Sequence, residues 1–473
     1  MPPVPGLADA FNAFIDVHPE YERTAALDEL RRREFSRLDE QGQIYIDYTG
    51  SGLYGSSQVN RHAGSLLGQV LGNPHSDSPA SRLSTSLVER CRERVLRFFQ
   101  ADPQEYAVVF TANASHALKL VGESYPFGSG DAFLLTFDNH NSVNGIREFS
   151  RLRGGRTTYV PMVPPELRVD ESVLDRHLEE SSRGGHNLFA YPAQSNFSGV
   201  QHPLEWIEKA QASGFDVLLD AAAFVPTNRL DLKRFHPDFV VLSFYKMFGY
   251  PTGVGALIAR HAALRKLDRP WFAGGTIEAA SVQADRFVFS TGSAGFEDGT
   301  LDFANIPAIE FGLDVIESVG LDIVHERVRQ LTGWTIEGLL DLKHPNGKPL
   351  VRLYGPAHAE RRGGTLAFNF YDALENIIDH REVERRAGGR NISLRSGCFC
   401  NPGAGELALG LSRGELEKCF AKSLRMTRED LRLCIDPKAT GAVRVSFGLA
   451  SNFADAHALV AFAATLTEGA SAG

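Results

Sequence analysis

The feature that most constrains the fold of this chain is a series of short, continuously apolar segments between residues 106 and 259. Apolar runs that do not alternate with polar residues are typical of strands buried on both faces, as in a mostly parallel sheet covered by helices. We therefore expect an α/β fold built on a seven-stranded sheet. The predicted strands are Tyr106–Phe110, Ala132–Phe137, Thr157–Met162, Asn187–Tyr191, Asp216–Asp220, Phe239–Phe244 and Val254–Ala259.

Amphipathic segments flank these runs. Residues 79–100 carry apolar side chains on one stripe with Arg and Glu between them, which predicts a helix. Residues 20–40 fit a charged surface helix, and residues 173–182 and 203–213 fit crossover helices. Ile306–Arg329 predicts one long helix that leads into a C-terminal α+β part. Strands are expected there near Thr365–Phe370, Ile392–Arg395 and Ala442–Ser446.

A length of 473 residues favours a large domain with a smaller one. We expect a large domain at 70–305 and a small C-terminal domain at 306–473. The N-terminal segment, 1–69, is expected to contribute to the small domain and to the entrance of the site.

Charge and cysteine content narrow the class of protein. The net charge of −9 does not favour binding to nucleic acid or to an anionic membrane surface. No apolar run is long enough to cross a bilayer, and the start of the chain lacks the pattern of a secretory signal. Five cysteines are few and odd in number, so we expect no disulfide framework and a reducing, cytoplasmic compartment.

Two charged residues stand at the ends of consecutive predicted strands. Asp220 ends one strand, and Lys246 follows the next, before a turn rich in Gly and Pro. An Asp there can pair with the protonated ring nitrogen of a cofactor, or it can simply cap a helix. A desolvated lysine amine forms imines readily, although an isolated lysine is more often a surface residue. Because neighbouring parallel strands end at one edge, we expect both side chains over one pocket.

Three further positions at strand ends favour a cofactor. Ala114 and Ser115 lie in a turn that opens an apolar helix, where a phosphate could bind, although a plain helix cap is the alternative. His140 could stack on a flat ring or be an ordinary loop histidine. Asn196 could donate a hydrogen bond to a cofactor hydroxyl or merely belong to a turn.

The C-terminal part carries two thiols, Cys398 and Cys400, in a loop rich in Gly and Pro, which indicates exposed, reactive sulfur. Zinc would need further ligands at defined spacing, and neither Cys419 nor Cys434 has a neighbouring His, so no metal is expected. Arg444 on a predicted strand could hold a substrate carboxylate or form a surface ion pair.

Together these segments resemble the class-V aminotransferase family of fold-type I pyridoxal-phosphate (PLP) enzymes. Within it they are most similar to the cysteine-desulfurase-like domain of molybdenum cofactor sulfurases. The resemblance spreads over nearly the whole chain. It is carried by Gly72–Ser76, Asp220–Thr227, Ser243–Gly253, Arg395–Ala404 and Gly441–Gly448.

The resemblance implies that PLP is the cofactor and that Lys246 holds it as a Schiff base. Asp220 would pair with the pyridine nitrogen, and His140 would stack on the ring. It also implies a homodimer in which Thr300 reaches the phosphate bound by the partner. The remaining implied cofactor contacts are Ala114, Ser115, Asn196, Ser243 and Tyr245.

For the reaction, the resemblance implies that sulfur is taken from L-cysteine and alanine is released. Arg444, Arg395 and Asn196 would bind the substrate. The desulfurase pattern Arg-x-Gly-x-x-Cys fits Arg395 and Cys400, so Cys400 rather than Cys398 is expected to carry the persulfide. The sulfur acceptor would be a separate protein or molybdenum cofactor, since the acceptor domain of full-length sulfurases is expected to be absent.

The chain departs from the pattern of simple desulfurases at two positions, in a way that resembles the sulfurase branch, and from the sulfurases at a third. Ala223 stands where they have a Gln near the ring hydroxyl, Tyr245 where they have a His, and Gly405 where sulfurases often have a Cys. Gly405 and the expected absence of the acceptor domain favour the alternative, a C–S lyase, epimerase or aminotransferase acting on another amino acid. A non-enzymatic scaffold is disfavoured because Lys246, Asp220 and Arg444 are all present.

Overall fold

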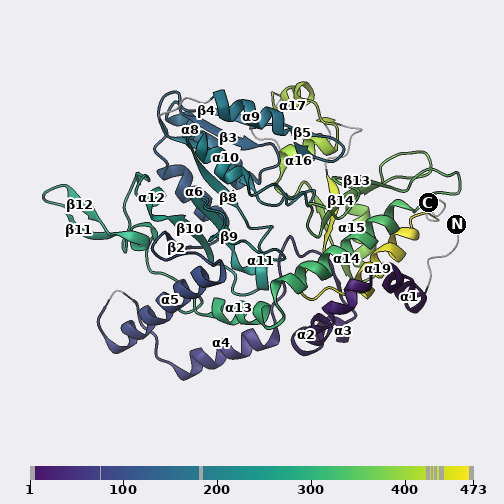
Figure 1. Cartoon of the computed structure of the whole chain (residues 1–473), viewed down its shortest axis with the longest axis horizontal. Helices are drawn as coiled ribbons and strands as arrows, with labels where there is room; N and C mark the ends of the chain where they lie inside the picture. Colours follow the sequence, from purple (N-terminus) through teal and green to yellow (C-terminus); the bar gives the residue numbers. More distant parts are fainter. Residues whose placement is uncertain are drawn as a thin grey trace.

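The computed structural model describes residues 6–74, 76–180, 185–421, 427, 430, 434–435 and 441–467. Within these residues, the centre of the molecule is a seven-stranded sheet of order β2-β10-β9-β8-β7-β3-β4 (Figure 1). All seven apolar segments predicted from the sequence are strands of this sheet, so the predicted fold class is confirmed. Its strands are β2 (Tyr106–Thr111), β3 (Ala132–Thr136), β4 (Arg156–Val160), β7 (Asn187–Pro192), β8 (Phe215–Asp220), β9 (Phe239–Ser243) and β10 (Gly255–Arg260).

The sheet is mostly parallel. β3, β4, β7, β8 and β9 pair in parallel with one another, whereas β10 runs antiparallel to both β2 and β9. The parallel strands therefore end at one edge of the sheet, where a ligand site is expected.

Helices cover both faces of the sheet, which explains why its strands are continuously apolar. Val108 of β2 packs in one core cluster with Val95 of α5 (Pro79–Phe98), and Val109 packs in another with Leu118 of α6 (Ala114–Ser124). The other elements of this region are α7 (Asn141–Asn144), α8 (Ile146–Leu152), α9 (Glu171–Glu180), α10 (Trp206–Ala212), α11 (Phe244–Phe248), α12 (His261–Leu264), η2 (Gly292–Phe296), β5 (Met162–Val163) and β6 (Arg168–Val169).

The C-terminal part holds a second sheet, with four antiparallel strands in its described residues and the order β13-β14-β17-β16. Two strands coincide with the predicted ones, the segment 392–395 divides between two strands, and β13 was not predicted. The elements are β13 (Val351–Tyr354), β14 (Thr365–Phe370), β15 (Ile392–Ser393), β16 (Arg395–Gly397), β17 (Ala442–Ser446), α15 (His380–Gly388), α16 (Pro402–Ala408), α17 (Arg413–Phe420) and α19 (Phe453–Ala464).

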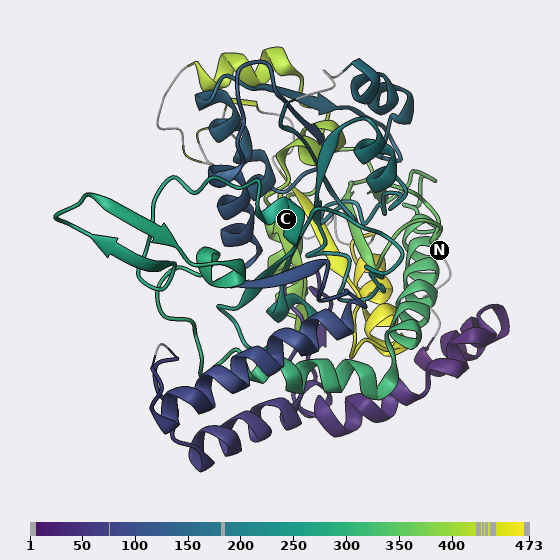
Figure 2. The same cartoon turned by 60° about the vertical axis from the view of Figure 1, so that its left-hand side comes forward.

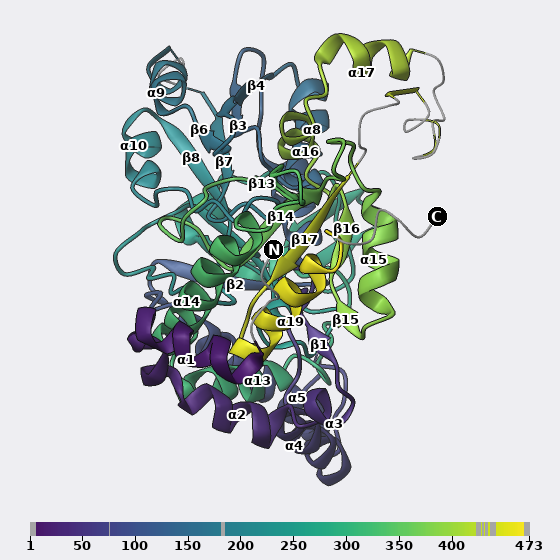
Figure 3. The ribbon, with the colours of Figure 1, turned by 90° about the vertical axis from the view of Figure 1, so that its right-hand side faces the viewer.

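The N-terminal segment packs against this C-terminal part. Its first strand, β1 (Ile44–Tyr45), pairs with β15, and Figure 3 shows its first helices beside α19. The predicted domain boundaries remain a prediction. The other N-terminal elements are α1 (Leu7–Val17), η1 (Pro19–Thr24), α2 (Ala26–Glu34), α3 (Arg37–Glu40) and α4 (Ser56–Gly68).

The single helix predicted over Ile306–Arg329 is wrong. The structure has two helices, α13 (Ala308–Val319) and α14 (Leu321–Leu340), separated at Gly320. Gly320 has φ +86° and ψ 134°, a conformation that a helix cannot contain and that other residues avoid. The apolar pattern continues through the break, which is why periodicity did not reveal it.

A two-stranded hairpin, β11 (Ile277–Ser281) and β12 (Arg286–Phe289), projects from the body of the molecule (Figure 2). Most of its residues are exposed, including several large apolar side chains, of which Phe287 contacts Phe272 in the segment before the hairpin. The exposed apolar residues of the hairpin and of the segment before it are Trp271, Phe272, Val282, Phe287 and Val288.

One disulfide is present where the cysteine count predicted no framework. Cys419 of α17 is bonded to Cys434, whereas Cys91 is a buried free thiol and Cys398 and Cys400 are exposed free thiols. Among the described residues, no helix combines the length and the apolar character that crossing a bilayer requires.

Candidate active site

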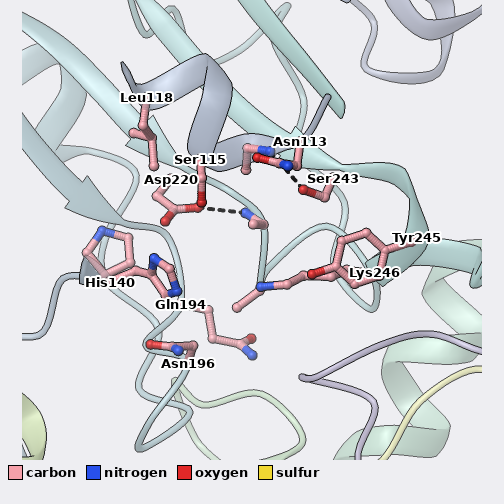
Figure 4. A pocket seen from close by; sticks show the side chains of 14 residues that line it. Asn113, Ser115, Leu118, His140, Gln194, Asn196, Asp220, Ser243, Tyr245 and Lys246 are labelled. Carbon is pink, nitrogen blue, oxygen red and sulfur yellow. Dashed lines mark hydrogen bonds between the residues drawn. The ribbon is translucent and has the colours of Figure 1, made fainter. Parts of the chain in front are cut away.

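A cavity of about 280 Å³ opens where β7, β8 and β9 end (Figure 4). Most of the predicted site residues line it together, although they come from separate stretches of sequence. The predicted residues in its wall are Ala114, Ser115, His140, Asn196, Asp220, Ser243, Tyr245 and Lys246. The wall also contains residues that the sequence analysis did not single out as site residues: Asn113, Leu118, Pro192, Gln194, Ala222 and Ala223.

The cavity contains the lysine and the carboxylate that the strand ends predicted. Asp220 is the last residue of β8, and its Oδ1 accepts a hydrogen bond from the Ala222 N–H at 3.0 Å. Lys246 lies in α11, which begins directly after β9. Burial lowers the pKa of Lys246, and the charge of Asp220 opposes that shift. A lysine with a lowered pKa is more often neutral near pH 7, which makes it a better nucleophile.

One end of the cavity is suited to an anion. The N-terminus of α6 faces it, and the Ala114 N–H donates to Ser243 Oγ at 2.8 Å. Ser115 Oγ lies 2.6 Å from Ser142 Oγ. Asn113 caps the helix by accepting from the His116 N–H at 3.0 Å, so the plain cap considered above is also present. Two hydroxyls, those of Ser115 and Ser243, therefore line the cavity together with the positive end of an 11-residue helix.

His140 is the N-cap of α7, and its Nδ1 accepts from the Ser142 N–H at 3.1 Å. In the neutral ring the proton therefore resides on Nε2. Burial lowers the pKa of His140, with Asp220 opposing the shift. A ring that stays neutral at neutral pH is suited to stacking on a flat cofactor.

The loop that carries Cys400 is fastened to the wall of the cavity. Phe399 and Cys400 have φ +56° and +55°, a left-handed turn. The Cys400 carbonyl accepts from the Asn141 N–H at 2.7 Å, and the Phe399 carbonyl accepts from Asn196 Nδ2 at 2.8 Å. Asn401 Nδ2 in turn donates to Asn196 Oδ1 at 2.9 Å. The amide of Asn196 is thus committed to this loop at both ends, whereas we predicted it near the ring hydroxyl.

The two thiols of the loop face different surroundings. Burial lowers the pKa of Lys246 and of Arg444, and the negative charge of a Cys400 thiolate is one of the smaller influences that oppose both shifts. The Cβ of Cys398 lies 3.8 Å from the position that a Cβ on Gly405 would take, so Cys398 sits beside α16. Cys400 is therefore the thiol on the side of the amine.

Arg444 and Arg395 lie just beyond the cavity, directly opposite each other on β17 and β16. Like charges in that register repel, and Asp47 lies between them. Asp47 Oδ1 is 3.0 Å from Arg444 Nη2, and Asp47 Oδ2 is 2.7 Å from Arg395 Nη2. A Cβ on Gly50 would lie 2.5 Å from Asp47 Oδ2, so a glycine is needed beside this carboxylate.

Arg444 retains a donor for a ligand. Its Nη1 donates to the Asn196 carbonyl at 3.1 Å, and its Nε is buried without an acceptor among the described residues. Two arginines and one Asp leave a net positive charge, which attracts a carboxylate. The sequence analysis missed Asp47, because nothing near residue 47 indicates a partner 397 residues away.

Thr300 lies apart from these residues. It lines a separate cavity of about 190 Å³ with His116 and Asp298, and its Oγ1 accepts from Asn73 Nδ2 at 3.2 Å. Within one chain, Thr300 does not belong to the wall of the larger cavity.

Comparison with known proteins agrees with this arrangement. The family model described as aminotransferase class-V matches residues 44–459, which includes both sheets and the whole cavity. The chain belongs to the class-V aminotransferase family. The predicted family resemblance is thereby confirmed, and with it the membership in a family of PLP enzymes.

Among curated proteins, this member of the class-V aminotransferase family is similar to the molybdenum cofactor sulfurase of Bos taurus, with 37% identity over 92% of the chain and 51% of the relative. The chain thus spans about half the length of that relative. Its fold is similar to a cysteine desulfurase from Thermococcus onnurineus NA1 (TM-score 0.78, 24% identity, 93% of this chain and 98% of that one). It is also similar to a cystine C–S lyase (TM-score 0.68, 18% identity, 89% and 97%).

Proposed function

We propose that this chain is a PLP-dependent cysteine desulfurase, which moves sulfur from L-cysteine onto Cys400 and releases alanine. One observation carries the proposal. An exposed free thiol sits on a loop fastened to the same cavity in which Lys246, with a lowered pKa, lies beside Asp220. The sulfurase and desulfurase names of the similar proteins support the same chemistry.

The donor set of the cavity fits PLP. Asp220 suits the pyridine nitrogen, His140 suits the ring face, and Lys246 would hold the cofactor as a Schiff base. Ser115 and Ser243, with the N-terminus of α6, suit the phosphate. Bound PLP supplies an electron sink for the electron pair left when the substrate loses its α-proton.

The residues of this chain would share the remaining work. Arg444 and Arg395 would bind the substrate carboxylate, and the Lys246 amine would take up the α-proton and later return a proton. The Cys400 thiolate would attack the substrate sulfur. The Cβ–S bond of L-cysteine then breaks, an S–S bond forms on Cys400, and protonation at Cβ completes L-alanine.

The test uses PLP-loaded protein incubated with L-cysteine, with alanine assayed while intact protein and peptides are analysed by mass spectrometry. We expect alanine and a gain of one sulfur atom at Cys400. Cys400→Ser should abolish the sulfur gain and reduce alanine formation at least 100-fold with PLP still bound, whereas Cys398→Ser, the matched control, should retain both. Full turnover by Cys400→Ser would favour the alternative, a C–S lyase, epimerase or aminotransferase acting on another amino acid.

We also propose a homodimer. The exposed apolar hairpin β11–β12 supports it, because an isolated two-stranded hairpin is only marginally stable in water. In the dimer, Thr300 would serve the phosphate of the partner. We keep the cytoplasm as the proposed compartment: the exposed free thiols Cys398 and Cys400 favour a reducing environment, whereas the Cys419–Cys434 disulfide is the one observation against it. The sulfur acceptor would be a separate protein or molybdenum cofactor.

A further inference from the structure

Gln194 is a buried side chain that is held by its amide oxygen. Its Oε1 accepts from Gln201 Nε2 at 3.1 Å and from Asn228 Nδ2 at 3.4 Å. These two donors fix which end of the amide is oxygen and leave the NH₂ group on the other side. No group of the described residues accepts a hydrogen bond from that NH₂. This NH₂ group is not among the fully buried side-chain atoms that lack a partner, so it is accessible from the cavity and can donate to a ligand bound there.

The amide of Gln194 lies in the wall of the active-site cavity. Figure 4 places it near Asn196, with Lys246 also in view. Gln194 forms an isolated bridge with Gln201 just after β7, and Asn196 lies in the turn that follows. A Cβ on Gly363 would lie 2.0 Å from Gln194 Oε1, so the amide reaches this place only because residue 363 has no side chain.

Ala223 occupies the same part of the wall. Gln194 and Ala223 both line the active-site cavity, and both also line a small space of about 20 Å³ beside it. Ala223 stands where the resemblance expects a Gln near the ring hydroxyl, and its methyl group cannot donate a hydrogen bond. Gln194 therefore presents an amide next to the position at which the expected amide is missing.

Other residues of the site suit the other acceptors of a bound cofactor and substrate. The anion site at α6 suits the phosphate, Arg444 suits the substrate carboxylate, and the Asn196 amide is committed to the Cys400 loop. The ring hydroxyl oxygen is the acceptor to which none of these residues is assigned.

We propose that Gln194 is a cofactor-binding residue whose NH₂ group donates a hydrogen bond to the ring hydroxyl oxygen of PLP, in place of the residue at position 223. The inference rests on the proposed function, since it requires PLP in this cavity. A donor at the ring oxygen stabilises its negative charge, so the imine formed with Lys246 holds its own proton less tightly.

The test is a pH titration of the visible absorption band of the PLP-loaded protein, together with the dissociation constant of PLP. We expect Gln194→Ala to raise the midpoint of the titration by about one pH unit, the size given by one hydrogen bond to a charged group. It should also weaken PLP binding roughly tenfold. Gln194→Glu has the same shape but replaces the donor by a negative charge, so its midpoint should rise further.

A second substitution separates donation from packing. Adding Ala223→Gln to Gln194→Ala supplies an amide from the neighbouring position and should return the midpoint towards that of the unmodified protein. Gln201→Ala is the matched control, because it removes a holder of the Gln194 oxygen and leaves the proposed donor in place; its midpoint should stay near that of the unmodified protein.

The outcomes are distinguishable. If the unmodified protein binds PLP but Gln194→Ala and Gln194→Glu titrate as it does, Gln194 is not the donor, and the proposed desulfurase function is untouched. A shifted midpoint that Ala223→Gln fails to restore would assign Gln194 a packing role and also overturn the inference. Absence of any visible band in the unmodified protein would remove both the inference and the proposed function.

Discussion

At the scale of single residues, Asp47 allows Arg444 and Arg395 to lie opposite each other by pairing with both. It is buried, as is Arg444, whereas Arg395 is half-exposed. We expect Asp47→Asn to lower the free energy of unfolding by about 3 kcal/mol, because removing one partner of a buried pair leaves the other charge uncompensated. The KM for the amino-acid substrate should rise about tenfold, because Arg444 loses the contact that orients it. Urea unfolding and steady-state alanine assays measure the two effects.

A double variant shows whether repulsion between the arginines is the cause. Removing Arg395 from the Asp47→Asn variant deletes the like charge opposite Arg444. The pair Asp47→Asn/Arg395→Ala should therefore be more stable than Asp47→Asn alone. If the two losses of stability simply add, Asp47 does not act by screening the arginines.

Lys246 gives a prediction about pH. Burial lowers its pKa from 10.5, so without cofactor the folded state binds fewer protons than the unfolded state at alkaline pH. The cost of burying the charged amine is fully present below the folded pKa and disappears as pH rises to 10.5. Lys246→Met should thus stabilise the cofactor-free protein by ~1 kcal/mol at pH 7 and by less near pH 10.

Calorimetry of both proteins at the two pH values measures this difference. The opposite trend, a gain in stability that grows with pH, would show that Lys246 is stabilised in its charged form. Lys209 is a suitable control for substitution, because it is a partly exposed lysine paired with Asp175 outside the cavity.

At the scale of elements, the contact between the Cys400 loop and the cavity wall depends on Asn401. Its Nδ2 donates to the Asp138 carbonyl at 2.7 Å and to Asn196 Oδ1, while its Oδ1 caps α16 by accepting from the Ala404 N–H at 3.2 Å. Asn401→Asp retains the cap and removes the two donations. We expect the persulfide on Cys400 to form at least ten times more slowly, with PLP binding unchanged, because the loop is held less well.

Rapid-quench mass spectrometry of the Cys400 peptide follows that rate. Asn401→Ala, which also loses the cap, should be slower still and less stable. Persulfide formation at the normal rate in Asn401→Asp would mean that the loop reaches the substrate without being fastened.

The elements also show what the sequence could and could not predict. The seven strands of the large sheet were predicted because burial on both faces makes each strand a continuous apolar run. Such a run is visible in the local sequence without knowledge of the neighbouring strands. Lys246 and Asp220 followed from their positions at strand ends. Gly320 was missed because its backbone angle leaves no trace in the apolar pattern. Asp47 and Gln194 were missed because their roles depend on contacts with distant segments, which local patterns do not contain.

At the scale of the whole molecule, the hairpin β11–β12 bears on assembly. Val288 is 59% exposed in the single chain, so a charge there should leave the fold of one chain intact. If the hairpin is buried between two copies, Val288→Asp should shift the protein towards monomer and weaken PLP binding, since Thr300 of one copy no longer reaches the other. Sedimentation at several concentrations measures this. An unchanged dimer in Val288→Asp would place the interface elsewhere, and a monomeric unmodified protein would remove the proposed role of Thr300.

The ion pair between Asp47 and Arg444 also affects the order in which the site can form during synthesis of the chain. The two residues are 397 positions apart, and β17, which carries Arg444, is one of the last described elements of the chain. At the usual pace of translation, Asp47 leaves the ribosome roughly 20 to 80 seconds before its partner exists. For most of that interval, until Arg395 is made, the nascent chain holds a carboxylate without either of its arginine partners. The large sheet can therefore form while the substrate-binding end of the cavity is still unformed. During synthesis the chain would pass through a stage that has the cofactor site but lacks the substrate site.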